Sequence, residues 1–167
     1  MTPATEKLLK DLKSAQWFSN CGKPVSSDAA PLSSLEEAEE VIQISCWEEV
    51  GQFGPRHSWE DTRLDAANHM TAAIQRHSWP RFQLWNGIVD GVKPQTEALI
   101  GRKCEGLQIP AEWVAGARWD LLHAAMQTEY ADIPTPRFYR VLAHWYCAGH
   151  FPCAWAGEYP EGRLVIY

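Results

Sequence analysis

The sequence has no long hydrophobic run, no excess of basic residues and no cysteine framework, and each absence excludes a class of protein. No apolar stretch approaches the roughly 18 residues that span a bilayer, and the lysines near the start precede no apolar segment of the secretory-signal type. The net charge is −6, from 15 Lys and Arg against 21 Asp and Glu, which argues against partners such as nucleic acid or anionic membrane. The five cysteines are odd in number and scattered, which indicates reduced thiols and predicts a cytoplasmic location.

What is present is the composition of an ordinary soluble globular protein. Of the 167 residues, 46% are hydrophobic and 22% are charged, which excludes disordered, collagenous and disulfide-scaffold classes. A chain of this length buries about 70% of its unfolded surface and needs no disulfide or metal for its core. We therefore expect residues 1–167 to form one domain, with no cofactor.

Apolar residues recur at helical spacing over most of the chain, which predicts a mainly α protein. Ser, Thr or Pro residues of the helix-start type precede these segments. We expect a single-domain bundle of about six helices, beginning near Thr2, Ser33, Ser58, Pro80, Pro110 and Thr135. Pro94 predicts either a kink in the fourth helix or its division into two helices.

Two helices and the tail carry more specific expectations. The second helix is expected over residues 33–50, with Val41, Ile42, Cys46 and Val50 on its apolar face. The third helix is expected to bury Trp59, Ala66, Ala67, Met70, Ile74 and His77. From about residue 153 to 167, short apolar runs flank a turn rich in Gly and Pro, which predicts a small C-terminal β-hairpin.

The acidic charge is concentrated in one segment. Residues 33–65 hold nine acids and two bases, a balance of −7, whereas the rest of the chain holds twelve acids and thirteen bases. One interpretation is a solvated helix face. The other is a docking surface for a basic protein, since clustered charge speeds association with an oppositely charged partner. The candidate contact residues are Glu36, Glu39, Glu40, Trp47, Glu48, Glu49, Trp59, Glu60 and Asp61.

Nine tryptophans are the exceptional feature of the composition. Most fall on the apolar stripes of the expected helices and are interpreted as core. Trp47 and Trp59 flank the acids, and an aromatic ring among charges is typical of an interface hot spot. Trp79, in a turn, and Trp119, between two charged residues, are also candidates for exposure.

The most regular chemical pattern is His144, Cys147, His150 and Cys153, at steps of three residues. Thiolates and imidazoles bind zinc, but such steps along one helix rotate around its axis and do not converge on one ion. A zinc site built on Cys147, His150 and Cys153 is therefore kept only as an alternative to buried cysteines. Cys21, which lies beside Asn20, is a candidate cysteine nucleophile. The residues that flank it match no motif specific to a family of cysteine enzymes.

Two stretches at the ends of the chain carry a family resemblance, WFSNCGKP over residues 17–24 and GHFPCAWAGEYPEGRLVIY over residues 149–167. They resemble bacterial immunity proteins of polymorphic-toxin, contact-dependent inhibition and type VI secretion systems. The resemblance covers about 27 residues, and the acidic middle of the chain lies outside it. It implies a non-enzymatic function, which is to bind a cognate toxin domain tightly and block it.

The leading hypothesis is thus a cytoplasmic immunity protein whose acidic surface binds a basic toxin, such as a nuclease. A small enzyme with a histidine and cysteine site near the hairpin is the first alternative. A non-catalytic adaptor subunit, in which the acids only solvate the surface, is the second.

Overall fold

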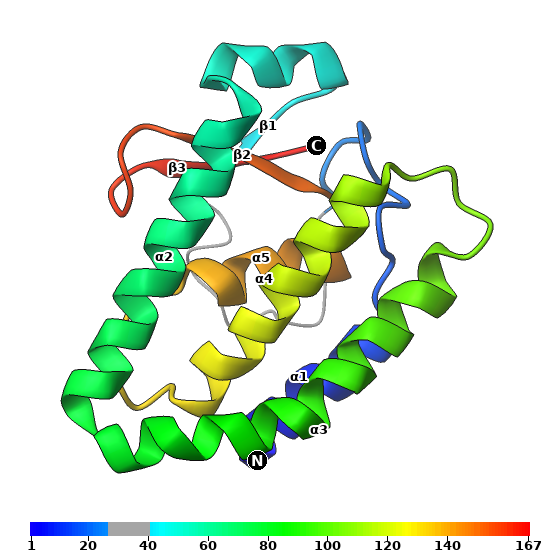
Figure 1. Ribbon diagram of the computed structural model, residues 1–167. Coiled ribbons are helices and arrows are strands. Elements are labelled where there is room, and N and C mark those ends of the chain that lie inside the picture. The colour runs from blue at the N-terminus through cyan, green and yellow to red at the C-terminus, as the bar shows by residue number, and fades with distance from the viewer. Residues whose placement is uncertain (27–40) are drawn as a thin grey trace.

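The computed structural model of the chain describes residues 1–26 and 41–167, and these residues form a mainly α fold with a small sheet (Figure 1). This confirms the predicted fold class. The 3-10 helix is named η2. In chain order the elements are α1 (Pro3–Lys13), β1 (Val41–Gln43), η2 (Trp47–Phe53), α2 (Arg56–His77), α3 (Trp79–Cys104), α4 (Ala111–Glu129), α5 (Phe138–Cys147), β2 (Pro152–Ala156) and β3 (Arg163–Ile166).

The helix starts predicted at Thr2 and Pro110 agree with the structure. Thr2 caps α1, since its Oγ1 accepts a hydrogen bond from the Thr5 amide at 3.4 Å, and a proline follows in the first turn. Ser78, two residues before the start expected at Pro80, caps α3 in the same way through the Arg81 amide. The helix α4 begins directly after Pro110. These local contacts satisfy backbone groups that a helix end leaves unpaired.

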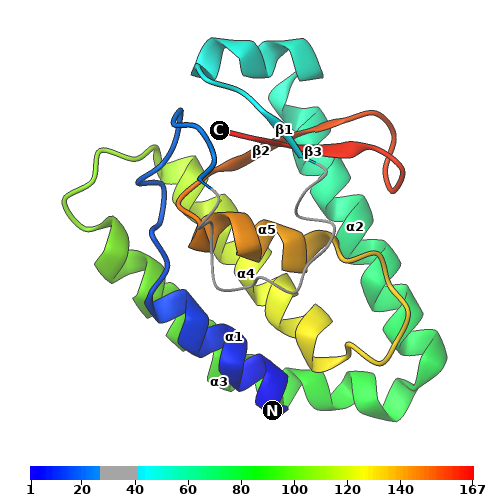
Figure 2. The ribbon, with the colours of Figure 1, turned by 180° about the vertical axis from the view of Figure 1, so that it is seen from behind.

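The central element is α4, which packs against α1, α3 and α5. Leu121, Ala124 and Ala125 on α4 are completely buried, and the small alanines allow close approach of the neighbouring helices. Figures 1 and 2 show α1 running alongside α3 on one side of this helix. No helix within the described ranges combines the length and apolar character that a membrane crossing requires.

The C-terminal hairpin is confirmed, and it belongs to a larger sheet than expected. β2 and β3 pair antiparallel, and β1 adds to the other edge of β3 in parallel, so the order is β1-β3-β2. Val41 lies opposite Leu164, and the Ile44 amide donates to the Ile166 carbonyl at 2.9 Å.

The helix expected over 33–50 is therefore wrong from Val41 onward, where a strand and then η2 are found. The physical reason is tertiary: β3 offers unpaired backbone groups, and two β-branched residues suit a strand at that edge. Residues 33–40 lie outside the described part of the chain.

The other differences concern the two long helices. α2 begins at Arg56, two residues before the expected start at Ser58, and His77 at its end is exposed rather than buried. α3 continues through Pro94 and changes direction along its length (Figure 1). Of the two possibilities for this proline, the kink within one helix is the one found.

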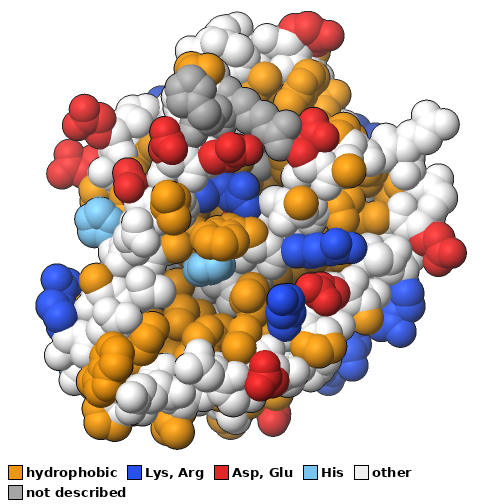
Figure 3. Space-filling view, in the orientation of Figure 1, with side chains coloured by type: hydrophobic (Ala, Val, Ile, Leu, Met, Phe, Trp, Pro, Cys, Tyr) orange, Lys and Arg blue, Asp and Glu red, His pale blue; other side chains and the backbone are white. Residues whose placement is uncertain are grey.

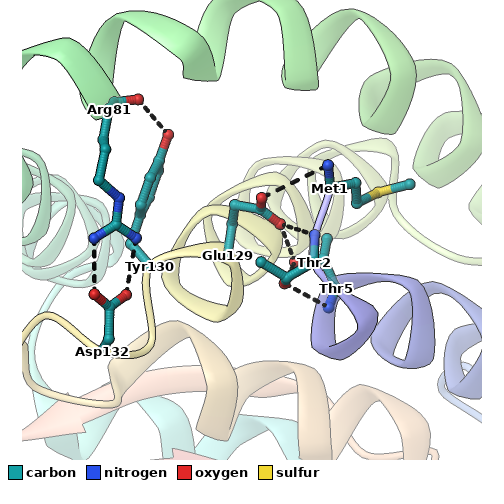
Figure 4. Close-up of polar contacts among 7 residues, drawn as sticks. All are labelled: Met1, Thr2, Thr5, Arg81, Glu129, Tyr130 and Asp132. Carbon is teal, nitrogen blue, oxygen red and sulfur yellow. Dashed lines mark hydrogen bonds and ion pairs between the residues drawn. The ribbon is translucent and has the colours of Figure 1, made fainter.

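Polar contacts near the end of α4 tie three helices together (Figure 4). The Glu129 carboxylate is buried and accepts from the Thr2 amide at 2.7 Å and from the Thr5 hydroxyl at 2.6 Å. These hydrogen bonds lower its pKa against the opposing effect of burial. Arg81 on α3 forms a two-point ion pair with Asp132 at 2.7 and 2.9 Å.

Two segments far apart in the sequence, residues 17–24 and 149–167, pack side by side. The Asn20 amide donates to the Gly149 carbonyl at 2.8 Å, and the rings of Phe18 and Phe151 meet edge to face, with centroids 5.7 Å apart. Gly149 has a φ of +85°, and a Cβ there would lie 2.9 Å from the side chains of Ser19 and Asn20. Glycine is thus required both by the backbone conformation and by the close packing.

Candidate functional site

The acidic contact residues predicted from the sequence have different surroundings. Glu36, Glu39 and Glu40 lie outside the described residues. The side chains of Glu48, Glu60 and Asp61 are exposed.

Glu49 has a structural role at the start of η2. Its Oε1 accepts hydrogen bonds from the Ser45 hydroxyl at 2.9 Å and from the Cys46 amide at 3.2 Å. These hydrogen bonds, that of Ser45 foremost, lower the pKa of Glu49. Replacing Glu49 would therefore disturb η2 as well as the surface charge.

The two tryptophans that flank the acids also differ. Trp47 is 38% exposed, and its ring lies against Trp113, with centroids 4.8 Å apart. Trp59 is only 8% exposed, and its ring packs on Phe138 with centroids 5.8 Å apart. The structure thus leaves Trp47 accessible to a partner and places most of Trp59 in the core.

A pocket of about 330 Å³ opens where η2, α2, α4 and β2 meet. Several of its lining residues are aromatic, Trp47 and Trp59 among them. Charged side chains lie among these rings. The lining includes Trp47, Trp59, Glu60, Arg63, Glu112, Trp113, Gly116, Asp120, Tyr146 and Phe151.

A second pocket, of about 350 Å³, adjoins the first along α2 and α4. Glu60, Arg63, Glu112 and Gly116 line both, so the two form one groove, called here the α2–α4 groove. Trp47 lies at one end of this groove, and Trp119, which is 42% exposed, lies at the other. Figure 3 shows acidic side chains gathered on the upper part of this face, around a hollow with basic surface at its bottom.

The floor of the groove is a buried ion pair. Arg63 on α2 donates from Nε to Asp120 Oδ1 at 2.7 Å, and the side chains of the two residues are 13% and 1% exposed. The Tyr146 hydroxyl donates to the other carboxylate oxygen, Oδ2, at 2.7 Å. Burial raises the pKa of Asp120, and the neighbouring Arg63 and Tyr146 oppose that rise. The pair ties α2, α4 and α5 together beneath the groove.

Gly116 and Tyr139 hold Arg63 in place. The guanidinium donates to the Gly116 carbonyl at 2.6 Å, and a Cβ at Gly116 would lie 3.3 Å from its nitrogens. Glycine therefore lets the guanidinium approach the backbone of α4. The Tyr139 hydroxyl donates to the Arg63 carbonyl and accepts from the indole of Trp119 at 3.1 Å. The exposed ring at one end of the groove is thus connected to its floor.

Sequence reasoning missed most of this groove. It counted Arg63 only as a base within an acidic segment, and it assigned no role to Glu112, Asp120 or Tyr146 at a site. One signal was present: Asp120 falls on the apolar stripe of its helix, between Ala117 and Leu121. A carboxylate at such a position is buried and needs a cationic partner. No pattern in the sequence indicates that this partner is Arg63, 57 residues away.

The alternative zinc residues are in the core. His144, Cys147, His150 and Cys153 are all buried. Burial raises the pKa of Cys147 and of Cys153 to about 12. Within the described residues, no group of three or more His, Cys, Asp or Glu side chains is placed to hold a metal ion. Cys21, the candidate nucleophile, has its pKa raised to about 12 by burial as well.

Comparison with known proteins finds no matching protein family, no similar curated protein and no similar solved structure. Function is therefore inferred from the α2–α4 groove. Exposed rings, a charged rim and a buried polar floor are typical of recognition surfaces.

Proposed function

We propose that the protein is an immunity protein that binds a cognate antibacterial toxin domain with a basic surface and thereby neutralises it. The observation that carries the proposal is the α2–α4 groove, which combines exposed tryptophans at both ends with acidic side chains along its rim. An aromatic anchor within a charged surround is the usual composition of a tight interface. The acids would also increase the rate of association with a basic domain.

The charge around the groove supports a basic partner. Glu48, Glu60, Asp61 and Glu112 are exposed acids on η2 and at the beginnings of α2 and α4. Among the described side chains that line the groove, the base Arg63 is paired with Asp120. An approaching protein therefore meets several exposed carboxylates.

The family resemblance supports the proposal in a second way. The two stretches that carry it, residues 17–24 and 149–167, pack against each other through Asn20, Phe18 and Phe151. They form one structural unit rather than two unrelated pieces. Phe151 from this unit also lines the groove.

The test is protection of cells. Each gene that neighbours the gene for this chain would be expressed in bacteria with and without the chain. We expect one neighbour to encode a domain that stops growth alone and is harmless when this chain is present. If no neighbour is toxic, or if toxicity persists in the presence of the folded chain, the proposal is wrong.

A charge-reversed variant tests the assigned surface. We expect E48K/E60K/D61K to lose protection and to associate more slowly, with a weaker salt dependence, than the unaltered chain. The matched control is D90K/E97K/E158K, which changes the net charge by the same amount at exposed sites on α3 and between β2 and β3, away from η2 and the start of α2. Equal loss of protection in both variants would refute the assignment of the groove, because the effect would then follow net charge alone.

A further inference from the structure

Two contacts hold Trp119, the exposed ring at one end of the α2–α4 groove. Its indole Nε1 donates to the Tyr139 hydroxyl at 3.1 Å. Its ring is stacked on the imidazole of His123, one turn further along α4, with centroids 4.2 Å apart and planes inclined by 28°. Because the ring is 42% exposed, burial alone does not fix its orientation. A titratable side chain therefore helps to set how Trp119 is presented to a partner.

A hydrogen bond determines which nitrogen of His123 carries the proton in the neutral ring. Its Nδ1 lies 2.8 Å from the Trp119 carbonyl oxygen. A carbonyl oxygen only accepts, so Nδ1 is the donor and Nε2 is the basic nitrogen. Acid adds the second proton at Nε2, and the imidazolium that forms needs water or a polar group at that atom.

The surroundings of His123 suit the neutral imidazole better than the cation. The imidazole lies between the rings of Trp119 and of Tyr139 from α5, whose centroid is 4.9 Å away. Aromatic faces attract a cation. Burial foremost, and also the charge of Arg63 on α2, nevertheless lower the pKa of His123 against the opposing effect of the hydrogen bond to the Trp119 carbonyl. The Tyr139 hydroxyl is neutral, since burial raises its pKa, and Asp120 on α4 is paired with Arg63 at 2.7 Å.

The lowered pKa makes the stacked arrangement sensitive to pH. In a conformation with the imidazole turned into water, the pKa of His123 would return toward its ordinary value of about 6.5. That conformation binds a proton more readily than the stacked one, so its population rises as the pH falls. The side chain of His123 is only partly buried, and a change of rotamer brings it to water while α4 stays folded.

We propose that His123 is a pH-dependent support for Trp119: the neutral imidazole holds the exposed indole ring at the end of the groove, and protonation releases it. The released ring keeps the hydrogen bond to Tyr139 but loses the stack on one of its faces. A ring that is already ordered loses less entropy when a partner covers it. Acid therefore weakens binding at this end of the groove, a consequence that rests on the proposed function.

NMR of the folded chain tests the support without a partner. The histidine ring protons, the nine indole N–H signals and the NOEs between the His123 and Trp119 rings would be followed from about pH 7.5 to about pH 5. We expect His123 to titrate with a midpoint below about 6.5. The Trp119 signal should shift with the same midpoint, and the NOEs between the two rings should be lost. The signal of Trp47, whose ring contacts Trp113, should not follow this midpoint.

Variants show whether His123 is the titrating group. H123F keeps a ring that does not titrate, H123Q removes the ring, and in both the Trp119 signal should become independent of pH over this range. The matched control is H69Q, because the exposed His69 on α2 also has its Nδ1 at 2.8 Å from a carbonyl oxygen, that of Asp65. Trp119 should titrate in H69Q as in the unaltered chain. The support is refuted if the NOEs persist when His123 is protonated, or if Trp119 still titrates in H123F or H123Q.

A second experiment measures the consequence for binding. With the toxin domain in hand, the affinity of the unaltered chain and of H123F would be compared over the same pH range. Relative to H123F, the unaltered chain should lose about twofold at the midpoint of His123 and about tenfold one pH unit below it, because only the supported fraction binds. An equal pH dependence in both chains would overturn the regulation of binding. If Trp119 is released as expected while no neighbouring gene is toxic, the proposed function fails and the pH-dependent support stands.

Discussion

The buried Arg63–Asp120 ion pair gives the sharpest prediction about stability. The substitution Asp120→Asn keeps the shape of the side chain and removes its charge. It leaves a guanidinium whose side chain is only 13% exposed without its counter-charge, and it places an amide in front of the Tyr146 hydroxyl. Removing one member of a buried pair costs about 3–5 kcal/mol. We expect the lower end, about 3 kcal/mol, because Arg63 reaches some solvent and keeps its hydrogen bond to the Gly116 carbonyl.

Urea denaturation measures this cost. With a slope of about 2 kcal/mol per molar urea, a loss of about 3 kcal/mol lowers the unfolding midpoint by about 1.5 M. The matched control is Asp132→Asn, which breaks the Arg81–Asp132 pair, whose side chains are 39% and 59% exposed. Exposed pairs add little to stability, so this variant should unfold close to the unaltered chain.

A double-mutant cycle separates the pair from its surroundings. Arg63→Met combined with Asp120→Asn should cost less than the sum of the two single changes, by about 1–3 kcal/mol, since the second change removes a charge already left unpaired. The reasoning is refuted if Asp120→Asn costs no more than Asp132→Asn, or if the two changes at the buried pair are simply additive.

Four further predictions concern other parts of the fold. The two-point contact with Arg81 lowers the pKa of Asp132 to about 2, so it stabilises the folded chain above about pH 4. That contribution is lost as the pH falls toward 2, and any difference in unfolding midpoint between Asp132→Asn and the unaltered chain should vanish over this range. Gly149→Ala should destabilise by at least about 1–2 kcal/mol in thermal or urea unfolding, because φ is +85° and a Cβ would lie 2.9 Å from two side chains. Gly87→Ala, with open space around it in α3, should stabilise by about 0.5–1 kcal/mol, and a loss of stability there would contradict the helical assignment. Mass spectrometry after brief treatment of the native chain with a maleimide should find the exposed Cys46 modified and the buried Cys147 and Cys153 unmodified. Cys153 lines the pocket at the Trp47 end of the α2–α4 groove, so its rapid modification would mean that this pocket opens more widely than the structure shows.

The sequence determined the helices whose signals are local. The start residue Thr2 acts on a backbone group three positions away, and the apolar stripe of α4 marks its buried face directly. The sequence likewise predicted the hairpin of β2 and β3, because a turn rich in Gly and Pro brings two neighbouring apolar runs together. These features depend on interactions between residues that are close in the chain. The spacing of residue types along the sequence is therefore enough to predict them.

Tertiary structure decided the features that depend on contacts between residues far apart in the chain. The spacing of residue types does not predict such contacts. Val41 and Ile42 fit a helical stripe and a strand equally well, and the free edge of β3, more than 120 residues later, selected the strand. In the same way, the sequence shows Arg63 only as one base within an acidic segment. The fold brings Asp120 to 2.7 Å from it and so makes it part of a buried ion pair. The sequence alone established that residues 33–65 are acidic. The groove that gives those charges a shape, with Trp47 and Trp119 at its ends, exists only because α2, α4 and η2 pack together.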